Sequence, residues 1–194
     1  MTTEQVRFND HRFRPHNSPP DFHPSVSSDG HQVAFRTVGG TDWWRLPEES
    51  RDTGVMFGFN RVMIPQGIEV GCEVDLDVTI QYDQATIMLR AGDTWVKAGL
   101  EYDNDKLYAG CVIANYYSDW SIQPAEHTIS KRFTIALKDR MLKVYLGDEM
   151  IREVVAFGDG KSEEVWVGVM GCSPKGTGTE VRFKDFTIKE GVRW

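Results

Sequence analysis

A strict alternation of apolar and polar residues runs through GIEVGCEVDLDVTIQYD, residues 67–83. Successive side chains of an extended strand point to opposite faces, so one face of this segment is apolar and the other is largely acidic. The apolar face carries Val70, Cys72, Val74, Leu76, Val78 and Ile80, and the polar face carries Glu69, Glu73, Asp75, Asp77 and Thr79. The pattern predicts a half-buried strand of an antiparallel sheet.

Further short segments with strand character follow this one at intervals of about 8–12 residues, separated by turn sequences such as AGD, DND and SPKGTG. No segment has the long apolar stripe of a helix. This arrangement predicts an all-β fold, an antiparallel β-sandwich or jelly roll, formed by residues 31–194 as one domain. The clearest of these segments are HQVAFRTV, ATIMLR, TWVKAGLEY, KLYAGCVIA, RFTIAL, EVWVGVMG and EVRFKDFTI.

Residues 1–30 differ from the rest because they are rich in Pro, Ser and His and have no apolar period. We expect an N-terminal arm that either lies over the domain or is partly disordered. The irregular spacing of His11, His16, His23 and His31, with no Cys or carboxylate pattern around them, argues against a metal site there.

The net charge of −7 argues against nucleic acid as a partner, because phosphates require a basic surface. No apolar run approaches the ~20 residues of a membrane helix, and the first residues lack a secretory signal. The three cysteines lie in apolar runs, which predicts buried thiols in a reducing compartment. We therefore expect a cytoplasmic protein that does not bind membranes and uses no cofactor.

Glu73, Asp75 and Asp77 share the acidic face of the first segment, with neighbours ~6.6–7 Å apart along the strand. This stretch resembles the Glu-x-Asp-x-Glu strand of bacterial lichenases and laminarinases, which have a concanavalin-like sandwich. A retaining glycoside hydrolase would use Glu73 and Asp77 as its carboxylate pair, although Asp77 is one methylene shorter than the Glu of that motif. The alternative is a solvated strand face, and the lack of other nucleophile motifs favours a protein that is not an enzyme.

Residues 82–102, YDQATIMLRAGDTWVKAGLEY, predict a hairpin with two different faces. One face is aliphatic and belongs to the core. The other combines large rings with charges, as binding surfaces do, or forms cross-strand ion pairs on a wet face. This second face carries Met88, Arg90, Trp95, Lys97 and Glu101.

The motifs YDQATIMLR, WVKAGLEY, YYSDWS and VGVMGCSPKGTGTEVRFKDFTI resemble a domain-of-unknown-function family with a concanavalin A-like lectin/glucanase fold. That family includes the fungal "regulation of enolase" proteins. TDWW, residues 41–44, fits the same pattern, and the resemblance covers roughly residues 33–190. It implies an intracellular jelly roll with a link to enolase and carbohydrate metabolism, but no established catalytic set. Thr86 departs from the family pattern, which usually has Gly after Asp-Gln-Ala.

The resemblance places NYYSDWSIQP, residues 115–124, beside the YDQ motif. Their side chains form either a polar and aromatic pocket for a sugar-like ligand or a structural corner of the sandwich. We predict a non-enzymatic protein that binds a sugar-like metabolite or a protein partner, with enolase the candidate by resemblance, and that modulates carbohydrate metabolism. The alternatives are a lectin-like module and the hydrolase. The predicted binding residues are Asp42, Trp43, Tyr82, Asp83, Gln84, Met88, Arg90, Trp95, Lys97, Glu101, Tyr117, Ser118, Asp119 and Trp120.

Overall fold

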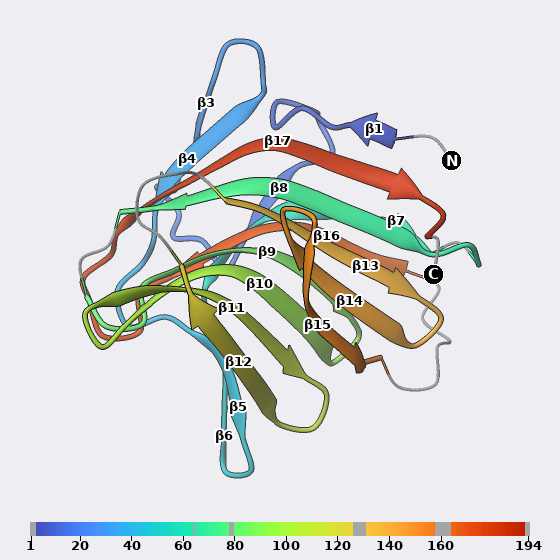
Figure 1. The fold of residues 1–194 in the computed structure, drawn as a ribbon. Coiled ribbons are helices and arrows are strands. Elements are labelled where there is room, and N and C mark those ends of the chain that lie inside the picture. Colours follow the sequence, from blue (N-terminus) through green and yellow to red (C-terminus); the bar gives the residue numbers. More distant parts are fainter. Residues whose placement is uncertain (1–2, 64, 78–79, 126–130, 158–163, 193–194) are drawn as a thin grey trace.

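The computed structural model describes residues 3–63, 65–77, 80–125, 131–157 and 164–192, and these residues form strands and no helix. Two antiparallel sheets lie one above the other, which confirms the predicted β-sandwich (Figure 1). Accordingly, no helix in the described ranges could cross a membrane.

The eight-stranded sheet is built around β8 and β17 (Figure 1). In spatial order its strands are β15 (Glu149–Val155), β14 (Met141–Leu146), β13 (Lys131–Lys138), β8 (Ile68–Leu76), β17 (Glu180–Glu190), β4 (Gln32–Arg36) and β3 (Ser25–Val26), and β1 (Thr3–Gln5) pairs with the end of β17.

The seven-stranded sheet has β9, β10 and β16 at its centre. In spatial order its strands are β12 (Ser118–Pro124), β11 (Lys106–Ala114), β10 (Thr94–Asp103), β9 (Gln84–Ala91), β16 (Glu164–Cys172), β7 (Val55–Val62) and β2 (Arg14–His16). A separate hairpin, β5 (Trp43–Leu46) and β6 (Glu49–Asp52), extends beyond this sheet beside β12 (Figure 1).

The alternation in β8 has the predicted effect on burial. Its apolar members from Val70 to Leu76 lie in the core between the sheets, whereas Glu73 and Asp75 point outward. Each fully buried aliphatic side chain contributes roughly 1.5–3 kcal/mol, so this one-sided burial holds the two sheets together. The prediction for Ile80 is wrong: the strand ends at Leu76, and Ile80 is 45% exposed in the following turn. Val78 and Thr79 lie outside the described residues.

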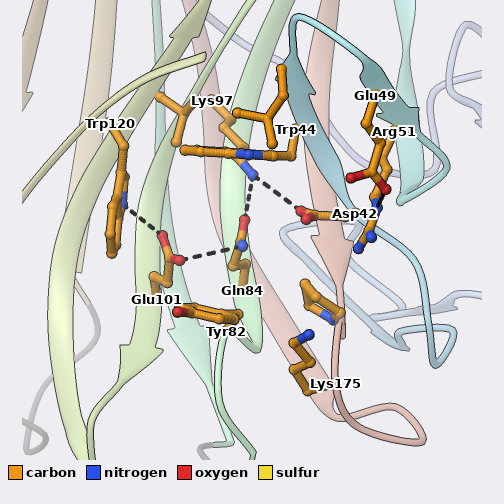
Figure 2. Close-up of a pocket in the computed structure, with 13 residues that line it drawn as sticks. Asp42, Trp44, Glu49, Arg51, Tyr82, Gln84, Lys97, Glu101, Trp120 and Lys175 are labelled. Carbon is orange, nitrogen blue, oxygen red and sulfur yellow. Dashed lines mark hydrogen bonds and ion pairs between the residues drawn. The ribbon is translucent and has the colours of Figure 1, made fainter. Parts of the chain in front are cut away.

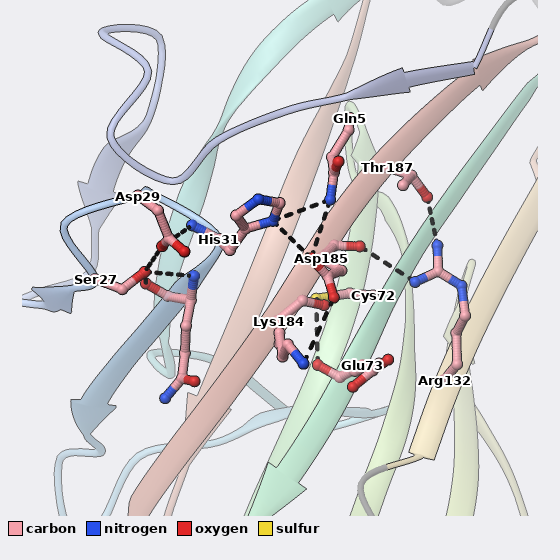
Figure 3. Close-up of polar contacts among 11 residues, drawn as sticks. Gln5, Ser27, Asp29, His31, Cys72, Glu73, Arg132, Lys184, Asp185 and Thr187 are labelled. Atoms are coloured by element: carbon pink, nitrogen blue, oxygen red, sulfur yellow. Dashed lines mark hydrogen bonds and ion pairs between the residues drawn. The ribbon is translucent and has the colours of Figure 1, made fainter.

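The N-terminal segment packs against the sandwich from residue 3 onward. It contributes β1, β2 and β3, and its side chains Val6, Phe8 and Phe13 join the core. The Nε2 group of Gln5 donates a hydrogen bond to Oδ1 of Asp185 at 3.0 Å, and this oxygen also lies 2.7 Å from Nδ1 of His31 (Figure 3). Strands of two or three residues are too short to show a period, which is why the sequence predicted an arm and no strands.

Cys72, Cys111 and Cys172 are buried, as predicted. Burial raises the pKa of each thiol well above its usual range, so these side chains act as small apolar groups. Among the described residues no group of His, Cys, Asp and Glu side chains has the arrangement of a metal site.

Candidate ligand-binding site

The candidate site lies on the outer face of the seven-stranded sheet, where the hairpin β9–β10 turns its mixed side chains away from the core. The opposite, aliphatic face of this hairpin belongs to the core, as predicted. The mixed face is not wet, because Met88, Trp95 and Lys97 are at most 2% exposed. The interpretation as exposed cross-strand ion pairs is therefore excluded.

The hairpin β5–β6 covers this face, and Arg45 anchors it. The backbone N–H of Arg45 donates to Oγ of Ser118 at 2.8 Å, and its guanidinium donates to the carbonyls of Asp93 and Asn115 at 3.0 Å. These three partners lie at β12 and in the turns that follow β9 and β11. The covering hairpin is thus tied to the edge of the sheet that it overhangs.

A second apolar cluster fills the space beneath the hairpin and includes Trp43 and Trp95. The Trp43 ring meets Trp95 edge to face at 5.6 Å, and its Nε1 donates to the carbonyl of Gly54 at 3.0 Å. A Cβ at Gly54 would lie 2.7 Å from Cδ1 of Trp43, so only glycine leaves room for this ring. Trp43, Trp95 and Met88, which the sequence placed in the site, therefore lie beneath it as packing residues.

A pocket of about 300 Å³ opens between the hairpin and the outer face of the sheet (Figure 2). Several of the predicted binding residues line it, namely Asp42, Tyr82, Gln84, Lys97, Glu101 and Trp120. The other lining residues were not predicted, namely Trp44, Leu46, Glu49, Arg51, Val112, Pro174 and Lys175.

A chain of polar contacts crosses the pocket (Figure 2). Nζ of Lys97 donates to Oε1 of Gln84 at 2.7 Å and lies 3.7 Å from Oδ1 of Asp42. Nε2 of Gln84 donates to Oε1 of Glu101 at 3.5 Å, and Nε1 of Trp120 donates to Oε2 of Glu101 at 3.1 Å. A buried ammonium group is tolerated only with such partners, so the cluster is held in one arrangement.

Glu101 has an unusual proton affinity for a carboxyl group. Burial raises its pKa to about 7; Lys97 and the Trp120 N–H oppose this shift, and Asp42 and Asp103 reinforce it. Near neutral pH this side chain can therefore both accept a hydrogen bond as a carboxylate and donate one as an acid. Ionisable groups perturbed in this way by burial and specific partners are frequent at functional sites.

Aromatic rings surround these polar groups (Figure 2). Trp44 and Trp120 stand perpendicular to each other with centroids 6.4 Å apart. Tyr82 adopts a φ of +67°, which is uncommon for a bulky residue. Its turn is fixed by the hydrogen bond from its own N–H to the carbonyl of Tyr102 at 2.6 Å. The Tyr82 ring is thereby held at the pocket wall.

The remaining predicted residues do not line the pocket. Asp83 is fully buried and accepts the N–H of Ile80 at 3.1 Å, which stabilises the turn before β9. Ser118 holds the hairpin, and Asp119 pairs with Arg152 at 2.5 Å. Tyr117 is 56% exposed. Within NYYSDWSIQP, therefore, Trp120 lines the pocket while its neighbours form the corner.

Arg90 also lies outside the pocket, with its guanidinium 5.6 Å from the centroid of the Trp43 ring. Thr86 lies beneath the pocket floor and lines a cavity of about 10 Å³ together with Gly99 and Gly110. The Thr86 side chain therefore narrows the space below the pocket and does not enter the pocket itself.

The acidic strand does not contribute to this site. Asp77 is held by Arg182, whose two terminal nitrogens lie 2.8 and 3.0 Å from its oxygens. This hydrogen bonding lowers the pKa of Asp77, whereas a glycosidase acid requires a raised pKa. Glu73 lies on the outer face of the other sheet, opposite Lys184 (Figure 3). The structure thus supports a solvated, ion-paired strand face and not the catalytic interpretation.

A model of the family described as "Protein of unknown function (DUF1349)" matches residues 17–191. The chain belongs to this family. A relative of this DUF1349 protein, "Regulation of enolase protein 1" of Saccharomyces cerevisiae, is 28% identical over 178 residues, which cover 84% of each chain. The predicted resemblance is therefore confirmed.

Solved structures agree with the DUF1349 protein in fold. A protein of unknown function from Saccharomyces cerevisiae has a TM-score of 0.82 at 22% identity, covering 97% of this chain and 100% of that one. The carbohydrate binding module CBM66 of Bacillus subtilis has a TM-score of 0.60 at 10% identity, covering 94% and 98%. At these identities the similarity establishes a lectin-like sandwich and nothing about ligands.

Proposed function

We propose that this protein binds a sugar-like ligand in the pocket lined by Trp44 and Trp120 and does not turn it over. The observation that carries the proposal is the buried set of Lys97, Gln84 and Glu101, which mutual hydrogen bonds fix in a pocket that two tryptophan rings also line. Aromatic faces stack on the apolar C–H faces of a pyranose, while fixed donors and acceptors bind its hydroxyls.

The size and charge of the pocket favour a small neutral ligand. Its volume of about 300 Å³ is at the lower end for small-molecule sites, which suits one sugar unit. Its charges are largely compensated, because Lys97 lies beside Asp42 and Arg51 pairs with Glu49 at 2.5 Å. A neutral polyhydroxylated ligand adds no uncompensated charge to this arrangement.

Titration calorimetry with a panel of neutral monosaccharides and short glycans tests this proposal. We expect at least one of them to bind the wild-type protein and to bind at least tenfold more weakly to Trp44→Ala, with an unchanged thermal melt. Failure of the whole panel to bind at millimolar concentration would refute the proposal. Release of a reporter from a chromogenic glycoside would instead identify a hydrolase.

A second candidate function is regulation of enolase through direct contact, in the cytoplasm. It is favoured by the 28% identity to "Regulation of enolase protein 1" and by two exposed rings beside the site. Tyr116 and Tyr117 are 82% and 56% exposed in the turn between β11 and β12. Exposed tyrosines are typical anchors of protein interfaces.

A pull-down with purified enolase tests this second candidate. The wild-type protein should retain enolase, and a Tyr116→Ser/Tyr117→Ser variant should not. A Tyr145→Ser variant, altered on β14 of the other sheet, is the control and should retain it. No retention by the wild-type protein, or equal retention by all three, would contradict a contact through this turn.

A further inference from the structure

A second hollow lies on the same outer face of the seven-stranded sheet, on β2, β7, β9 and β16. Two adjoining depressions of about 390 and 410 Å³ share His16, Asn60 and Trp166 as lining residues. None of these residues lines the pocket described above. Trp43 connects the two regions, because Arg90 of the hollow lies over its ring and its sequence neighbours Asp42 and Trp44 line the pocket.

Trp166 rests on a floor made of glycine. Gly58 of β7 and Gly168 of β16 are directly paired across the sheet. A Cβ at Gly58 would lie 2.5 Å from Cζ2 of Trp166, and a Cβ at Gly168 would lie 2.6 Å from its Cη2. The six-membered ring of the indole therefore lies against the backbone. A side chain on either glycine would occupy the same space. It remains partly exposed and lines both depressions, so it offers a flat aromatic surface.

The surroundings of this ring are cationic, although the chain as a whole carries a charge of −7. Nε of Arg90 donates to the carbonyl of Gly92 at 3.1 Å, and Nη1 of Arg14 donates to the carbonyl of Phe13 at 2.8 Å. Within the described ranges, neither arginine has a carboxylate at ion-pair distance. His16 also lines the hollow, as does Arg12, which is paired with Glu4 and Asp10. Glu164 is the acidic residue at the edge.

We propose that this hollow is a second binding site, which takes a sugar unit carrying an anionic group, either a carboxylate or a phosphate. The sugar ring stacks on Trp166, and the anion pairs with the guanidinium group of Arg90, which lines the same depression as the ring. A guanidinium fork matches the paired oxygens of both anions, and an aromatic surface beside it fixes the ring. The proposal does not depend on the neutral ligand of the pocket.

Calorimetric titrations of the full chain with glucuronate and with glucose 6-phosphate test this site. Glucose and inorganic phosphate serve as the two partial probes. We expect at least one anionic sugar to bind at least tenfold more tightly than either partial probe. Its affinity should fall as salt is added. Glucuronate and glucose 6-phosphate together show which anion is preferred. Equal binding of inorganic phosphate would reveal an adventitious ion only and would overturn the proposal.

Three variants locate the binding. Trp166→Ala should weaken the binding of the anionic sugar at least tenfold. Arg90→Gln, which leaves the packing of the indole intact, should weaken this binding to a similar extent. Trp120→Ala, in the pocket, should leave the affinity for the anionic sugar unchanged. If Trp120→Ala lost the binding of the anionic sugar while Arg90→Gln retained it, the anionic sugar would be assigned to the pocket and not to the hollow. No binding by the wild-type protein at millimolar concentration would also refute the second site.

Discussion

The ammonium group of Lys97 lies 2.7 Å from Oε1 of Gln84, and only 2% of the lysine is exposed. Lys97 and Gln84 belong to neighbouring strands of a sheet face that would ordinarily be solvated, and the β5–β6 hairpin is what removes them from water. The candidate site therefore depends on a covered charge cluster, and its stability and its binding can be tested separately.

Replacing Lys97 by methionine should destabilise the fold. The change nearly keeps the length of the side chain but leaves Asp42 and Gln84 without their cation, and loss of one buried partner costs roughly 3 kcal/mol. Urea unfolding measures this loss of stability in Lys97→Met, with Lys184→Met as the control. Lys184 is 54% exposed, so its replacement should change stability by less than about 0.5 kcal/mol. Equal effects of the two substitutions would show that the buried cluster adds nothing to stability.

The raised pKa of Glu101 predicts a pH dependence of stability. Its pKa is about 7 in the fold and 4.5 as a free side chain, so the folded state binds the proton more tightly. The free energy of unfolding contributed by this group is therefore largest below pH 4.5 and falls as the pH rises to about 7. The loss is on the order of 3 kcal/mol by linkage.

Urea unfolding of the wild type and of Glu101→Gln between pH 4.5 and pH 8 isolates this contribution. The difference in stability between the two proteins should move in favour of the variant as the pH rises, and then level off. Glutamine retains a hydrogen-bonding side chain of the same size but cannot titrate. Parallel profiles would mean that Glu101 titrates alike in the folded and unfolded chains.

Gly99 and Gly110, paired across β10 and β11, should respond differently to the same substitution. A Cβ at Gly99 would lie 2.1 Å from the carbonyl oxygen of Ala85, whereas at Gly110 the nearest atom is Cγ2 of Ile122 at 3.4 Å. Gly99→Ala should cost at least about 2–3 kcal/mol, because backbone must move, and Gly110→Ala less than about 1 kcal/mol. Thermal melts of the two variants give the comparison, and similar melting temperatures would contradict this account of the close packing at Gly99.

The sequence was sufficient for the fold because β8, β9 and β10 are long and alternate. The burial of alternate residues between Val70 and Leu76, and between Ile87 and Leu100, follows directly from the period of two. Local pattern could not place Ile80, because its backbone N–H donates a hydrogen bond to the side chain of Asp83, which lies further along the chain and fixes the turn.

The site was only partly predictable because its cover comes from short and irregular segments. TDWW drew attention to Trp43, yet in a strand of four residues nothing indicates that Trp43 points inward and Trp44 into the pocket. Alternation shows only that the two residues face opposite ways, and not which of them points inward. Lys175 lies in a loop without any period, so no sequence pattern orients it.

The most direct test of the central claim uses the indole N–H signals of the six tryptophans in a two-dimensional NMR spectrum, assigned by single Trp→Phe substitutions. During titration with a neutral sugar that binds, the signals of Trp120 and Trp44 should shift, because Nε1 of Trp120 is bonded to Glu101 within the pocket. The signal of Trp166, in the other hollow, should stay in place. Shifts confined to Trp166, or saturable binding that moves neither Trp44 nor Trp120, would contradict the assignment of the pocket as the sugar site.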